Sequence, residues 1–160
     1  MCSSDLVTVA ISRTGAVELR TPGGVLLRRD LPPRWWEPAG AGGDGDPQGG
    51  GTGSRWGLRS QVPPDARFFG LATTGPGGLP RTGAHRVGGL SSGAMRHAHG
   101  PGATRAMMPL QLVVADAGTH LVFHDTTWAG TVTLWQGEEG SGSGHDRPGR
   151  CRAQFDGGPL

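Results

Sequence analysis

Apolar residues in this chain occur in short alternating runs separated by glycine-bearing turns, and this spacing constrains the fold more than any other feature. Residues 6–11 place Val7, Val9 and Ile11 on one side of an extended chain and Thr8 and Ala10 on the other, which is the period of a β-strand. No window carries apolar residues at the i, i+3, i+4, i+7 spacing of an amphipathic helix. The sequence therefore predicts an all-β protein whose helices are few and short.

The alternating pattern continues through most of the chain. Turns at 12–15 and 21–24 connect residues 6–11 to strands at 16–20 and 25–29, so these three strands form a meander. Further strands are predicted at 55–62, 108–115, 119–124, 131–135 and 150–155. Between the second and third of these, residues 116–118 are of the type that closes a hairpin.

The return strand of that hairpin has two unlike faces. Leu121 and Phe123 share one face, while His120, Val122 and His124 share the other. Because an antiparallel sheet buries its more apolar face, we expect Leu121 and Phe123 to point inward and the histidines to point toward solvent or a second layer.

The residues that build cores are few, since Leu, Val, Phe and Ile together make up 29 of the 160 residues. Ten of them fall in residues 5–31 and nine in residues 109–135, so we expect these two segments to supply most of the buried apolar surface and the residues between them to supply little. Residues 39–54 hold eight glycines and are predicted to form a flexible loop. So thin a core suggests a chain that is incomplete or that depends on a neighbouring domain.

Charge and terminal residues limit the possible partners. The net charge of +2 comes from basic and acidic residues spread along the chain, which disfavours nucleic acid as a partner. No apolar run approaches the length of a membrane span, and residues 1–5 lack the pattern of a secretory signal, so a cytoplasmic location is expected. Residues 1–5 also fit a non-native start. Cys2 and Cys151 have no zinc-site spacing, and free thiols are favoured over a disulfide.

The residues that could act in catalysis or bind a metal ion do not occur at the spacing of a known type of site. Glu138 and Glu139 are neighbours, and neighbours on an extended chain point apart, so they do not fit the facing carboxylates of a glycosidase. His97 and His99 could both reach one ion, but no third ligand is placed by the sequence, and exposed loop histidines are favoured. No catalytic, metal-binding or cofactor-binding residue is predicted. The tryptophans suit either a sugar-stacking platform or core filling. They are Trp35, Trp36, Trp56, Trp128 and Trp135.

Three segments, 65–71, 108–116 and 118–126, in this order resemble the N-terminal β-sandwich of glycoside hydrolase family 31, the family of α-glucosidases and α-xylosidases. The resemblance covers residues 6–160 and implies a β-sandwich of the galactose-mutarotase-like type. In that family the sandwich packs against a (β/α)8 barrel that carries both catalytic aspartates and acts on α-linked oligosaccharides and glycosides. Because the barrel has no counterpart here, the chain is expected to be inactive alone.

The resemblance also implies a role for residues 72–107, which correspond to a loop that borders the family's active site. His85 and Arg86 align with part of that loop's motif, and Ser91 lies where the family has a polar residue near the sugar. The family's carboxylate at this place is missing, since the motif here ends in Gly88, Gly89, Leu90 and Ser91. Substrate contacts are therefore expected only from His85, Arg86 and Ser91.

Two other hypotheses remain open. One is a free-standing carbohydrate-binding or mutarotase-like sandwich, in which a histidine and a glutamate would converge on one cleft. The other is a poorly folded fragment of a decayed or misread gene, which the thin core and the altered loop suggest.

Overall fold

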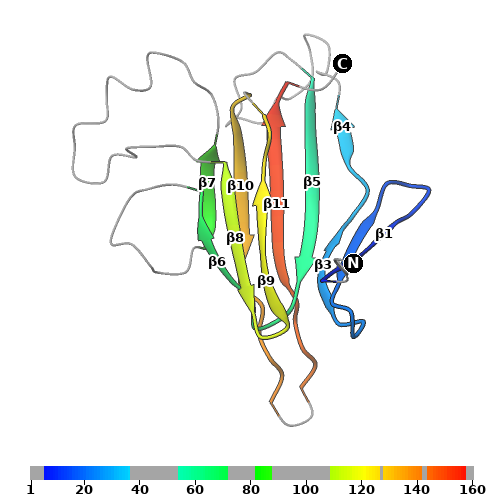
Figure 1. Cartoon of the computed structure of the whole chain (residues 1–160). Helices are drawn as coiled ribbons and strands as arrows, with labels where there is room; N and C mark the ends of the chain where they lie inside the picture. Colours follow the sequence, from blue (N-terminus) through cyan, green and yellow to red (C-terminus); the bar gives the residue numbers. More distant parts are fainter. Residues whose placement is uncertain are drawn as a thin grey trace.

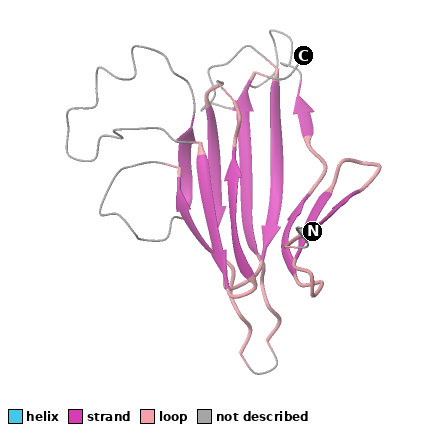
Figure 2. Cartoon of the chain, in the orientation of Figure 1, coloured by secondary structure: helices cyan, strands magenta, loops and turns pink. Residues whose placement is uncertain are grey.

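The computed structural model describes residues 6–36, 54–71, 82–87, 109–126, 128–141 and 144–157. These residues contain no helix, and their strands form two antiparallel sheets (Figures 1 and 2). The prediction of an all-β protein is confirmed. Within the described ranges there is accordingly no helix of the length and apolarity needed to cross a membrane.

The larger sheet has eight strands, in the order β1-β2-β3-β5-β11-β10-β7, with β4 also paired to β5. β3 and β4 share one edge of β5, where β3 pairs with residues 60–61 and β4 with residues 55–57. The strands are β1 (Thr8–Ile11), β2 (Val17–Arg20), β3 (Leu26–Asp30), β4 (Arg34–Trp36), β5 (Arg55–Val62), β7 (Gly83–Val87), β10 (Gly130–Trp135) and β11 (Gly149–Asp156).

The predicted meander is confirmed in β1, β2 and β3, and its two turns are built in the same way. Ser12 begins the first turn and its hydroxyl accepts a hydrogen bond from the Ala16 amide at 3.0 Å. Thr21 begins the second turn and accepts from the Val25 amide at 3.1 Å. Each turn also contains a glycine with positive φ, 82° at Gly15 and 83° at Gly24.

The smaller sheet has the order β6-β8-β9. Its strands are β6 (Arg67–Gly70), β8 (Leu110–Ala115) and β9 (Gly118–Phe123). The hairpin predicted between the last two is confirmed, with Ala115 opposite Gly118 across its turn. All three segments that carry the resemblance to family 31 therefore belong to this one sheet.

The two sheets pack face to face as a sandwich. Figure 1 shows β8 and β9 lying over β10 and β11, and the buried side chains of the two sheets form one core. The smaller sheet supplies Phe68 and Val113, and the larger sheet supplies Val62, Val87, Val132, Leu134, Cys151, Ala153 and Phe155. Ala66 and Leu71 close the core next to β6.

Our expectation about which segments fill the core is half wrong. Residues 5–31 contribute only Leu27 to the buried apolar residues of the described chain, and β1 is exposed along its whole length. In Figure 1 the β1–β3 meander extends to the side of β8 and β9, so most of it has no second layer to pack against. Residues between the two segments, Val62, Phe68 and Leu71 among them, fill the core instead.

The orientation of β9 also differs from the prediction. Leu121 and Phe123 are 61% and 58% exposed, whereas His120 and His124 face the larger sheet. The histidines therefore face a second layer, which was one of the two expected alternatives. The predicted inward orientation of Leu121 and Phe123 was wrong. The reason is that this part of the larger sheet presents Arg28, a buried polar residue, to β9.

Residues 72–107 were predicted to be a loop, yet Gly83–Val87 forms β7 and pairs with β10. Glycines on both sides of this short segment hid its strand character in the sequence. The glycine-rich segment 39–54 lies, except for Ser54, outside the described residues.

One corner of the smaller sheet explains the Phe-Phe-Gly-Leu sequence at 68–71. Gly70 has φ of 88°, and a Cβ atom there would overlap the carbonyl oxygen of Leu110. Leu71 follows with φ of 64°, is fully buried, and donates its amide to that oxygen at 2.8 Å. The shape of the corner therefore depends on the missing side chain of Gly70.

Candidate functional site

The predicted substrate-loop residues do not come together. His85 and Arg86 are consecutive in β7, so their side chains project to opposite faces of the larger sheet. His85 is partly buried and its Nε2 lies 3.1 Å from the Thr82 carbonyl oxygen, whereas Arg86 is exposed. Ser91 lies outside the described residues, and so do His97 and His99.

The carboxylate of Glu138 and the thiol of Cys151 take part in the packing of the fold. Glu138 forms an ion pair with Arg147 across a bridge between two strand extensions. Burial raises the pKa of the Cys151 thiol to about 11, and this cysteine is free, as expected. In the part of the chain that the structure describes, no three His, Cys, Asp or Glu side chains could hold a metal ion together.

A buried polar cluster lies between the sheets beside the apolar core. The Arg28 guanidinium donates to Asp30 at 2.6 Å and to the Ser60 hydroxyl at 2.8 Å. On the facing strand, His120 and His124 point toward this arginine. Neither ring nitrogen of His120 has a hydrogen-bond partner in the described structure, and the same is true of Nε2 of His124.

These surroundings keep both histidines neutral. Burial lowers the pKa of His120 and of His124 to about 4, and the positive charge of Arg28 adds to the decrease. A histidine with so low a pKa could act as a base, but its substrate would have to enter between the sheets. The cluster is consequently part of the interior, and it makes the interior sensitive to acid.

The outer face of the smaller sheet is apolar, and we call it the apolar face. Phe68, Gln111 and Val113 point into the core, so the residues that alternate with them point outward. In register across the sheet, Phe69 lies beside Leu112, which lies beside Leu121, and Leu110 lies opposite Phe123. The apolar face thus consists of Phe69, Leu110, Leu112, Val114, Leu121 and Phe123. Two exposed polar residues of the same outer side, Arg67 and Thr119, border it next to Val114.

The outer face of the larger sheet is basic, and we call it the arginine face. It comprises the exposed residues Arg34, Arg59, Arg86, Arg150 and Arg152. A shallow groove of about 170 Å³ crosses it over β4, β5 and β11. The groove forms because Gly57 has no side chain, although its neighbours in register are Arg34 on β4 and Gln154 on β11.

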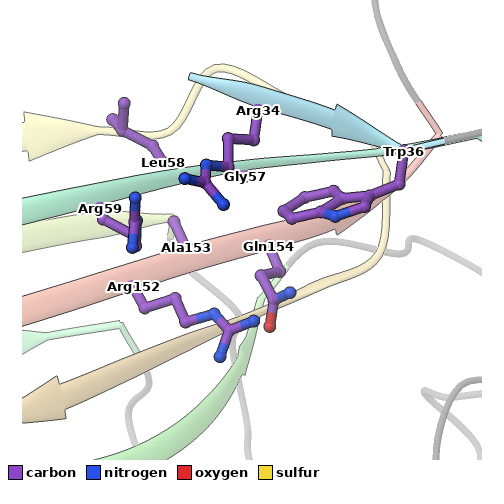
Figure 3. A pocket seen from close by; sticks show the side chains of 8 residues that line it. All are labelled: Arg34, Trp36, Gly57, Leu58, Arg59, Arg152, Ala153 and Gln154. Atoms are coloured by element: carbon purple, nitrogen blue, oxygen red, sulfur yellow. The ribbon is translucent and has the colours of Figure 1, made fainter. Parts of the chain in front are cut away.

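Figure 3 shows how the groove is lined. Trp36 lies at one end and Arg59 at the other, Arg34 reaches in from β4, and the Arg152 and Gln154 side chains extend from β11 between these ends. The tip of the Trp36 ring passes 3.0 Å from the position of a Cβ atom built on Gly57. Among the described residues that line the groove, none is acidic.

The tryptophans do not form one stacking platform. Trp56 stacks on Phe155 with ring centroids 4.8 Å apart, which is the core-filling alternative. Trp135 is exposed and lies 5.8 Å from the Arg150 guanidinium. Of the described tryptophans, Trp36 alone lines the groove.

Sequence reasoning missed both outer faces. Alternation showed that each strand has two faces, but the arginines of the groove lie up to 118 residues apart in the sequence, from Arg34 to Arg152, and no local pattern joins them. A signal was available in β11, where Arg150 and Arg152 alternate with small or apolar residues. Comparisons with protein-family models, with curated proteins and with solved structures found no match to this chain.

Proposed function

We propose that this chain is a non-catalytic β-sandwich module that docks through its apolar face on a catalytic domain. The resemblance noted above favours one occupant for that face, the (β/α)8 barrel of a family 31 α-glycosidase, and a galactose-mutarotase-like type for the sandwich. The observation that carries the proposal is the exposure of Leu121 and Phe123, at 61% and 58%, on the edge strand β9 of a face with no polar side chain between them and Phe69.

An exposed apolar face of this kind is unfavourable for a free domain. Contiguous apolar patches on soluble proteins mark contacts with other proteins, ligands or membranes, and each large side chain removed from water contributes about 1.5 to 3 kcal/mol. The apolar face spans three paired strands, which suits a broad contact with another folded domain better than a small ligand.

The carboxylates support a non-catalytic role because most of the described ones are used to hold the fold. Asp65 accepts from the Asp116 amide at 2.6 Å and so ties β6 to the β8–β9 turn. Glu18 pairs with Arg20 and Arg29, and Asp156 pairs with Arg55. Hydrolysis of a glycoside would need two carboxylates facing a cleft, so this chemistry is assigned to the docked domain.

The test compares the chain alone with the chain produced together with the polypeptide encoded next to it. We expect no hydrolysis of an aryl α-glycoside by the chain alone, and hydrolysis by the combined protein. Hydrogen exchange should then show protection of β8 and β9 on combination. The double variant Leu121→Thr/Phe123→Thr should reduce both effects, while the control Val9→Thr, on the exposed strand β1, should change neither.

Two results would contradict the proposal. One is glycoside hydrolysis by the chain alone. The other is protection of β8 and β9 that depends only on the concentration of this chain, since that would assign the apolar face to a second copy.

A further inference from the structure

We infer that the groove on the arginine face binds an acidic sugar. The carboxylate or sulfate group of this sugar would lie between Arg59 and Arg152. This site is separate from the proposed docking function, because the groove lies on the outer face of the larger sheet and the apolar face lies on the outer face of the smaller sheet.

The groove brings like-charged arginine side chains close together. Arg59 and Arg152 are directly opposite each other in the β5–β11 register, where like charges destabilise a sheet. Arg34 on β4 brings a third guanidinium to the same groove. Such a cluster costs stability in the empty protein, and the cost is removed by an anion that contacts the arginines together.

Within the described chain, no carboxylate neutralises Arg34, Arg59 or Arg152. The acidic residues of the same sheet have other partners. Glu18 pairs with Arg20 and Arg29, at 2.8 Å and 2.7 Å, and Asp156 pairs with Arg55 at 3.1 Å. Arg34, Arg59 and Arg152 form no ion pair with a described residue, so their donors are available to a ligand.

The lining of the groove suits an anionic group attached to a polar ring. Guanidinium groups bind the oxygens of carboxylate and sulfate groups through paired N–H donors. Beyond them, the Trp36 ring forms an apolar wall and the Gln154 amide offers a donor and an acceptor. An indole packs well on the C–H face of a sugar ring, and an amide suits its hydroxyl groups. The groove therefore matches an anionic group followed by a polar ring.

Gly57 is the residue that keeps the groove open. A Cβ atom at this position would lie 3.0 Å from the Trp36 ring and 3.1 Å from the Ala153 carbonyl oxygen. A branched side chain there would occupy the space between Arg34 and Gln154. Gly57→Val should consequently weaken binding without removing any arginine.

The experiment is calorimetric titration of the full chain, at low ionic strength, with a glucuronate-containing disaccharide, its neutral glucose counterpart and inorganic sulfate. We expect the uronate to bind at least about tenfold more tightly than the neutral sugar, since hydrogen bonds between a guanidinium and a carboxylate are stronger than those to a neutral hydroxyl group. Inorganic sulfate should bind more weakly than the uronate because it has no ring to contact Trp36.

Variants assign the binding to the groove. Arg59→Gln/Arg152→Gln should weaken uronate binding by about tenfold or more, and Gly57→Val and Trp36→Ala should also weaken it. The matched control is Arg86→Gln, which removes a charge from the same face outside the groove and should leave binding unchanged. Thermal melting of each variant without ligand shows that it is folded.

Equal affinity for the uronate and the neutral sugar would overturn the inference. So would sulfate binding as tight as that of the uronate, an equal loss of affinity in Arg86→Gln, or no binding of the uronate at all. The variant Leu121→Thr/Phe123→Thr should bind the uronate normally, so failure of the docking proposal and failure of this inference are distinguishable.

Discussion

The outer face of the smaller sheet presents leucine, valine and phenylalanine side chains, whereas the outer face of the larger sheet presents arginine, tryptophan and glutamine. Both faces belong to one sandwich and share one interior, yet they favour different contacts. The apolar face gains by excluding water against another folded surface, and the arginine face gains by taking up an anion. The comparison shows that exposure to solvent alone does not tell what a face of the sandwich binds. The chemistry of its side chains is needed as well.

The largest expected effect is the difference in folding stability between a substitution in the interior and one on the apolar face. Phe155 is 1% exposed and contacts Trp56 and His124, whereas Phe123 is 58% exposed. Phe155→Ala should lower the free energy of unfolding by about 3 to 5 kcal/mol because it leaves a cavity. Phe123→Ala should change it by less than about 0.5 kcal/mol. Urea unfolding measures both, and equal losses would show that the two sheets do not pack as described.

The next effect concerns the polar part of the interior. Because the folded-state pKa of His120 and His124 is lowered to about 4 from 6.5, the unfolded chain binds more protons between these values. Stability is therefore full above pH 6.5 and is lost as the pH falls toward 4. Between pH 7.5 and pH 5 we expect a loss of about 2 kcal/mol from the buried His124 and a smaller loss from His120, which is partly exposed to solvent.

Variants identify the groups that cause this pH dependence. In His120→Gln/His124→Gln, urea unfolding at the two pH values should give more nearly equal stabilities. The control His145→Gln, at an exposed position, should keep the full difference. An unchanged pH dependence in the double variant would assign the effect to other groups.

A smaller effect tests the arginine face without any ligand. Arg152→Glu replaces the like-charge pair with an ion pair between Arg59 and the introduced carboxylate in the same register, so stability should rise by about 0.5 to 1 kcal/mol. Added salt should reduce the gain. Arg86→Glu, whose partner in register is Thr131, should give no gain. Thermal melting distinguishes the two, and a loss in Arg152→Glu would show that Arg59 and Arg152 are not in contact across the strands.

The smallest change in stability is expected on the apolar face itself. Leu121→Thr/Phe123→Thr should alter the free energy of unfolding by less than about 0.5 kcal/mol, since threonine suits a strand and both side chains are exposed. Urea unfolding of the variant and of the unaltered chain measures this change. A large loss of stability would show that these side chains are buried in the free chain, contrary to the comparison.

Much of the fold could be predicted because strands carry their signal locally. Alternation and glycine turns located the β1–β3 meander, β5, and the β8–β9 hairpin, with bounds that differ from the structure by one or two residues at most. β4, β6 and β7 were missed as strands. Each is short and contains or adjoins proline or glycine, so its hydrogen bonds to β5, β8 or β10, which the sequence does not show, are what make it a strand.

The candidate sites could hardly be predicted. Neither His85 nor Arg86 shares a site with the other, and the groove brings together Arg34, Arg59 and Arg152 from three strands. Pairing between strands distant in sequence determines such neighbours, and only the register of the sheet shows that Arg59 lies opposite Arg152.

The sequence by itself determined that the chain forms strands, where most of them begin and end, and which residues share a face, because all three depend on neighbours along the chain. The tertiary structure alone decided which of those faces is covered. For β9 it covered the histidine face and left Leu121 and Phe123 exposed. The physical reason is that burial depends on what the facing layer offers, and Arg28, Asp30 and Ser60 offer β9 a polar surface rather than an apolar one.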